Sequence, residues 1–89
     1  MNKTMMNILA CPMDKNHPLE LFEIENADNI ILEGILFCSK CSRFYPIIEE
    51  IPIMLPDELR DKKQEIEFLK KHRDKIPEKI ISQANPWHL

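Results

Sequence analysis

Three cysteines offer the most specific chemistry in this sequence. Cys38 and Cys41 form a C-x-x-C motif, a spacing that lets two thiolates converge on one tetrahedral ion. Cys11 opens a comparable segment, in which Asp14 stands where a second cysteine would complete a four-cysteine site. A carboxylate can ligate zinc, and the ring of His17 offers another fourth ligand. The spacing predicts a structural zinc site formed by Cys11, Asp14, Cys38 and Cys41.

The same three thiols allow other interpretations. An empty knuckle held by packing, or a disulfide from Cys11 to Cys38 or Cys41, is the alternative to a zinc site. Thioredoxin-like redox chemistry is disfavoured, because this C-x-x-C opens no helix. A rubredoxin-like iron site would need a fourth thiolate. We expect the site to be structural whichever metal state holds.

Residues for catalysis and for nucleotide binding are scarce. The sequence holds no Ser/His/Asp grouping that can be placed on rigid elements, and its histidines are scattered. Glu49-Glu50 is interpreted as a solvated turn rather than an acid/base pair. A loop that cradles phosphates needs glycines for close approach of the backbone, and Gly34 is the single glycine. We therefore expect a protein that is not an enzyme and that binds no nucleotide cofactor itself.

The charge balance argues against nucleic acid as a direct ligand. The net charge is −3, whereas proteins that bind nucleic acid alone usually carry a basic surface. The basic run at 70–73 is interpreted as a solvated helix face. No apolar stretch approaches the roughly 20 residues of a membrane helix, and an odd number of cysteines is not typical of a secreted disulfide framework. The sequence predicts a cytoplasmic protein that binds no membrane.

Alternating apolar residues predict the strands that would position the cysteines. A short helix over 4–9 leads into the first cysteine, and turn residues occupy 26–29. The second strand is expected to be broken or bulged near Gly34. Proline cannot donate to a ladder, so Pro46 and Pro52 place the last two strands at edges or irregular positions. The expected strands span residues 19–25, 30–37, 44–48 and 51–55.

The composition changes in the second half of the chain. Strong helix formers predict a helix over 57–73, and Pro77 suits the first position of another. The first helix carries only a narrow stripe, formed by Leu59, Ile66, Leu69 and Arg73. The apolar tail at 87–89 is expected to fold back on the protein or onto a partner. The expected fold class is α+β: a small zinc-ribbon-like antiparallel β-sheet module over residues 1–56, with a short N-terminal helix, and a C-terminal helical extension of the same domain over residues 57–89.

Residues 44–55 are apolar on both faces of their two expected strands. One interpretation is a sheet covered on both sides, with the C-terminal helices sheltering it. The other is an exposed hydrophobic patch for a partner, which monomers rarely carry at large size. Patterning alone does not decide between the two.

Two stretches of the sequence resemble the Trm-one-twelve family of methyltransferase activators. The first is MMNILACP at 5–12, followed by Lys15 and by PLEL at 18–21. The second comprises GILFCSKCSRFYPI at 34–47 and IPIMLP at 51–56. The resemblance covers residues 5 to about 60. The helical insertion that eukaryotic members carry between the two cysteine pairs is missing, so the chain is similar to archaeal or bacterial members.

The resemblance implies a non-catalytic zinc-knuckle platform that binds S-adenosylmethionine-dependent methyltransferases and keeps them soluble and active. Their substrates would be tRNA, rRNA or a translation release factor. S-adenosylmethionine would then be held only by the partner, and RNA would be reached only through the complex. Members add a strand to the partner's sheet by backbone pairing.

The family's functional positions can be carried over residue by residue. Cys11, Cys38 and Cys41 match its metal positions, whereas Asp14 departs from its four-cysteine pattern. The partner-facing segment is matched by Phe44, Tyr45, Ile51, Pro52, Ile53, Met54 and Leu55. Two other classes of function stay open: a stand-alone zinc ribbon that binds nucleic acid, disfavoured by the acidic balance, and a small redox carrier, disfavoured by the incomplete cysteine set.

Overall fold

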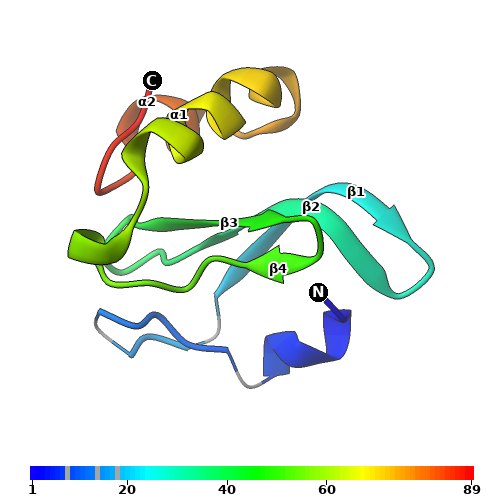
Figure 1. Ribbon diagram of the computed structural model, residues 1–89. Helices are drawn as coiled ribbons and strands as arrows, with labels where there is room; N and C mark the ends of the chain where they lie inside the picture. Colours follow the sequence, from blue (N-terminus) through cyan, green and yellow to red (C-terminus); the bar gives the residue numbers. More distant parts are fainter. Residues whose placement is uncertain (8, 14, 18) are drawn as a thin grey trace.

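One antiparallel sheet organises the chain. The computed structural model describes residues 1–7, 9–13, 15–17 and 19–89. The four strands lie in the order β1-β2-β3-β4, so each strand pairs with its neighbour along the sequence (Figure 1). Their bounds are Glu20–Ala27 for β1, Ile30–Phe37 for β2, Phe44–Ile48 for β3 and Ile51–Pro52 for β4. The α+β class and the four strands are confirmed, but β4 ends earlier than predicted at Pro52, which has no N–H to donate to a ladder.

Residues with positive φ form the hairpin turns. Asp28 has a φ of 54° between β1 and β2, and Glu49 and Glu50 have φ values of 49° and 71° between β3 and β4. Two successive positive φ values suit a two-residue hairpin, although glutamate rarely occupies them. The predicted irregularity near Gly34 is present in both strands: the register shifts at Glu23/Glu25, where β1 has an extra residue, and again at Glu25/Asn26, where β2 has the extra residue Leu32. A Cβ atom on Gly34 would come within 2.9 Å of the Phe22 carbonyl oxygen, so this close approach requires glycine.

The predicted helix over 57–73 is wrong as one continuous element. The chain instead forms a 3₁₀ turn η2 (Asp57–Leu59), helix α1 (Lys62–Lys71) and a 3₁₀ turn η3 (Arg73–Lys75). The break falls at Arg60, which is extended because its guanidinium enters the core, and at Asp61, whose carboxylate accepts the Gln64 N–H at 3.1 Å.

Two further helical elements lie at the ends of the chain. The predicted second helix is α2 (Glu78–Gln83), which follows Pro77. The predicted N-terminal helix is a 3₁₀ helix, η1 (Lys3–Asn7). In the basic run at 70–73 the side chain of His72 is buried, and its Nε2 lies 3.0 Å from Glu33 Oε1, so this run is only partly solvated.

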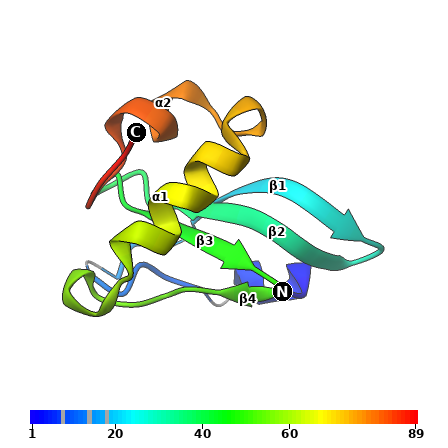
Figure 2. The same ribbon diagram turned by 45° about the horizontal axis from the view of Figure 1, so that its top comes forward.

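Both faces of the sheet are covered. Helices α1 and α2 lie over one face, and the N-terminal segment lies beneath the other (Figures 1 and 2). The helical side buries one cluster, made of Ile35, Phe37, Phe44, Phe68, Leu69, Ile76, Ile80, Ile81 and Ala84. The opposite side buries a second cluster, made of Met1, Cys11, Leu19, Ile31, Leu36, Cys38, Tyr45 and Ile47. Strand β3 therefore supplies core residues to both sides, as the first interpretation of its apolar pattern expects.

The C-terminal tail returns to the protein. Trp87 and Leu89 pack against the helical-side cluster, and the Leu89 N–H donates to the Ile81 carbonyl at 2.9 Å. The prediction that the tail folds back is confirmed.

Candidate metal centre and docking edge

Two similar turns present the cysteines. The Lys15 N–H donates to the Cys11 carbonyl at 2.7 Å, and the Ser42 N–H donates to the Cys38 carbonyl at 2.8 Å. Each turn closes on a residue with a left-handed backbone, Lys15 at φ 62° and Ser42 at φ 60°. The second turn follows β2 directly and leads into β3, so the sheet fixes its position.

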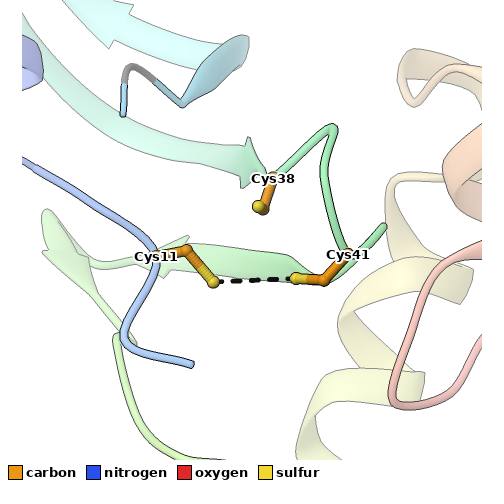
Figure 3. A group of neighbouring side chains, drawn as sticks. All are labelled: Cys11, Cys38 and Cys41. Atoms are coloured by element: carbon orange, nitrogen blue, oxygen red, sulfur yellow. Dashed lines mark hydrogen bonds between the residues drawn. The ribbon is translucent and has the colours of Figure 1, made fainter. Parts of the chain in front are cut away.

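The three sulfur atoms converge on one point (Figure 3). They lie within 4.8 Å of one another, and Cys11 Sγ is 3.7 Å from Cys41 Sγ. Zinc–sulfur bonds of ~2.3 Å in a tetrahedron place two sulfurs about 3.8 Å apart. A disulfide bond would need about 2.05 Å, and none of the three cysteines is in a disulfide. The arrangement fits a tetrahedral metal ion and shows none of the disulfides considered from the sequence.

Hydrogen-bond donors surround the sulfurs. Tyr45 Oη lies 3.1 Å from Cys11 Sγ, and Asn16 Nδ2 donates to Cys38 Sγ at 3.6 Å. Burial, and then the contact with Cys11, raise the pKa of the Tyr45 hydroxyl, which therefore stays protonated and able to donate. The Asp57 carboxylate and then the neighbouring Cys41 raise the pKa of Arg43, so a fixed positive charge lies beside the cluster. Donors of this kind commonly hydrogen-bond to the ligand atoms around a bound metal.

The fourth ligand is not defined by the described residues. Among them the metal-binding group consists of the three cysteines. Asp14, the predicted fourth ligand, lies outside the described part of the chain; in sequence it follows Cys11 at the interval that separates Cys41 from Cys38. His17 is not brought into the group, and its Nδ1 lies 2.7 Å from the Leu9 carbonyl oxygen.

The predicted partner-facing residues fall into two groups. Phe44 and Tyr45 are fully buried, one on each side of the sheet, so their side chains do not reach the surface. The other five follow the β4 edge: Ile51 is 61% exposed, Leu55 is 39% exposed, and Pro52, Ile53 and Met54 are half-buried.

Leu59, at the end of η2, is 65% exposed, and we group it with these five residues because it follows them closely in the chain. The sequence pattern assigned it to the stripe of a long helix. Its position on a short turn directly after the IPIMLP segment is the signal that could have placed it at the surface.

The two edges of the sheet differ in character. Along β1, Glu23 and Glu25 are exposed. A hydrogen bond with Lys3, and to a smaller extent one with Asn26, holds the pKa of Glu23 below its ordinary value. Charged side chains of this kind protect an edge strand from pairing with another chain. From Ile51 to Leu55 the opposite edge carries no charge. We define Ile51, Pro52, Ile53, Met54, Leu55 and Leu59 as the apolar edge.

The outer side of β3 beyond β4 is already closed. The Phe44 N–H donates to the Asn85 carbonyl at 3.1 Å, and the Phe44 carbonyl accepts from the Arg60 guanidinium. Residues of the C-terminal extension thus complete the pairing that the short β4 leaves unmade.

No helix in the described ranges combines the length and apolarity that crossing a bilayer requires.

Comparison with known proteins gives consistent matches. The model of the family described as Trm112p-like protein matches residues 2–50. A UPF0434 protein of Dechloromonas aromatica is 35% identical over 67% of this chain and 88% of its own length. A UPF0434 protein of Nitrosococcus oceani is 34% identical over 74% of this chain and 100% of its own length.

A solved structure also matches. In the complex between the Haloferax volcanii Trm112 methyltransferase activator and a candidate methyltransferase, the matching chain is 38% identical with a TM-score of 0.64. The match covers 67% of this chain and 100% of the matching one.

Proposed function

Because the chain belongs to the Trm112p-like family, we propose that it is a non-catalytic subunit that binds and activates an S-adenosylmethionine-dependent methyltransferase. The substrate of that enzyme would be tRNA, rRNA or a translation release factor, which would place the complex in the cytoplasm. The partner would hold S-adenosylmethionine and the acceptor. This chain would keep the partner folded and soluble.

The observation that carries the proposal is the apolar edge. Both faces of the sheet are closed and the β1 edge is acidic, whereas Ile51, Leu55 and Leu59 are the large side chains of the apolar edge that are most exposed. A partner strand could pair with the backbone here while its apolar residues cover these three side chains. The contact would also cover hydrophobic surface that a soluble monomer leaves bare at some cost in solubility.

We further propose that Cys11, Cys38 and Cys41 hold a zinc ion, with Asp14 as the fourth ligand. The geometry of the three thiols and the donors around them support zinc binding by the cysteines. The equal sequence intervals in the two turns support Asp14 as the fourth ligand. The ion would be structural: it would fasten the N-terminal segment to the turn between β2 and β3. The centre of the site is lined by buried Cys11 and Cys38, which leaves little room for a substrate.

The binding proposal is tested by charge substitutions on the apolar edge. Ile51→Asp and Leu55→Lys should each weaken binding to a co-expressed methyltransferase on the order of a hundredfold, because each removes an apolar contact and places a charge in the interface. The free variants should fold as the wild type does, since both positions are exposed. Ala27→Asp, on the other edge strand, is the matched control and should bind normally.

Co-purification, calorimetry of the purified pair and methylation of the partner's substrate would measure the effect, with circular dichroism to check the fold. Wild-type affinity in both folded variants would show that another surface forms the interface.

A further inference from the structure

The C-terminal extension is hydrogen-bonded to the second cysteine turn. Asn85 forms a parallel bridge with Arg43, and its N–H donates to the Ser42 carbonyl at 2.7 Å. Its side-chain Nδ2 donates to the Cys41 carbonyl at 3.0 Å. Asn85 therefore donates two hydrogen bonds to the turn that presents the metal-binding thiols.

A second tie joins the other end of the extension to the same turn. Arg43 donates from Nε to Asp57 Oδ1 at 3.0 Å and from Nη2 to Asp57 Oδ2 at 2.8 Å. The same guanidinium lies beside Cys41. The first and the last parts of the extension thus both hold residues 41–43.

The turn and the extension depend on each other for their geometry. The turn is held by the adjoining strands and by the Ser42 N–H bond to the Cys38 carbonyl at 2.8 Å, and zinc bonds to Cys38 and Cys41 would fix its two ends more tightly. The carbonyls of Cys41 and Ser42 point at Asn85 only while the turn keeps its shape. An ion that fixes the turn therefore also fixes the acceptors that hold the extension.

We propose that zinc binding at the cysteine cluster and docking of residues 57–89 on the sheet are coupled, so that each strengthens the other. The inference rests on the zinc part of the proposed function and is independent of the methyltransferase. Thermodynamic linkage requires the two effects to be equal: the factor by which docking raises the affinity for zinc is the factor by which zinc raises the equilibrium constant for docking.

The first test measures zinc affinity in the full-length chain. Competition with a chromophoric chelator, under reducing conditions, should show affinity reduced about two- to tenfold by Asn85→Ala, which removes one side-chain hydrogen bond. Asp57→Asn should change it in the same direction, because it weakens the Arg43 tie. Gln83→Ala, an exposed change at the end of α2, is the control and should leave zinc affinity unchanged.

The second test measures docking with and without zinc. Trp87 is the single tryptophan and packs against the helical-side cluster, which joins sheet and helix residues, so its emission reports docking. Removing zinc should shift that emission to the red and speed amide exchange in α1 and α2 several-fold. Amides of the β1–β2 hairpin should exchange at the same rate in both states.

The outcomes separate the possibilities. Lower zinc affinity in Asn85→Ala and Asp57→Asn, with faster exchange in the zinc-free wild type, supports the coupling. Equal affinity in all variants, or a zinc-free chain whose extension exchanges as slowly as before, overturns it. A wild-type chain that binds no zinc overturns it too, while methyltransferase binding stays separately testable. If Asn85→Ala does not fold, the wild-type exchange comparison decides alone.

Discussion

Arg60 is the residue whose environment departs most from its type. Its side chain is fully buried, its Nε lies 3.0 Å from Glu65 Oε1, and it donates to the Phe44 carbonyl. Its guanidinium carbon lies 4.9 Å from the ring centre of Phe44, 5.0 Å from that of Tyr45 and 5.5 Å from that of Trp87. Planar stacking and several fixed donors are properties of arginine that lysine lacks, so we expect Arg60→Lys to be poorly tolerated.

Removing one partner of this buried ion pair should be strongly destabilising. Arg60→Met or Glu65→Gln should lower the free energy of unfolding by about 3–5 kcal/mol, because the remaining group is left buried without compensation. The double variant Arg60→Met/Glu65→Leu should recover part of the loss. Lys79→Met breaks an exposed pair with Glu20 and should cost less than about 1 kcal/mol. Urea unfolding of the wild type and the four variants measures these values; a cost for Arg60→Met as small as that of Lys79→Met would contradict the assignment.

The Arg43–Asp57 pair predicts the response to acid. The Arg43 guanidinium holds the pKa of the Asp57 carboxyl below its ordinary value of 3.8. A carboxyl with a lowered pKa in the folded state contributes stability above its ordinary pKa, and this contribution is lost as pH falls toward the lowered value. The Asp57→Asn variant should therefore lose less stability than the wild type between about pH 5 and pH 2. Melting temperatures across that range test this, and parallel curves for the two proteins would refute it.

At the scale of elements, the extension closes the helical side of the sheet through its last residues as well as its helices. Trp87→Ala should lower the free energy of unfolding by roughly 1–3 kcal/mol, since it removes a half-buried aromatic side chain from the cluster and from the face of Arg60. Deleting residues 86–89 should cost at least as much. Gln83→Ala serves as the exposed control. An unchanged melting temperature after the deletion would mean that the tail contributes nothing to the packing.

Local patterns in the sequence were sufficient for the strands and for the convergence of the cysteines. Period-two alternation set β1 to β3 within about two residues, and the C-x-x-C interval placed Cys38 and Cys41 on one turn. The break between η2 and α1 was missed because strong helix formers continue through it. Burial of Arg60 depends on Phe44 and Glu65 together, a tertiary arrangement that helix propensity does not contain.

At the scale of the whole molecule, three layers leave one apolar edge free. The N-terminal segment and the helices cover the two faces of the sheet, so a partner of the proposed kind would meet an edge rather than a face. Phe44 and Tyr45 then act from inside, by fixing the strand next to the edge. This division of roles explains why a single apolar run in the sequence contains both core and surface residues.

The turn at Glu49 and Glu50 bears on how copies of the chain behave toward one another. Both residues adopt positive φ, which asparagine and glycine tolerate better, yet both are exposed glutamates at the tip of the hairpin beside the apolar edge. Replacing them with Asn-Gly should raise the melting temperature and, at high concentration, promote aggregation, because two negative charges no longer keep identical edges apart. Light scattering during storage would measure this, and a variant as soluble as the wild type would count against it. We therefore expect the two charges of this turn to limit self-association of chains whose apolar edge is uncovered.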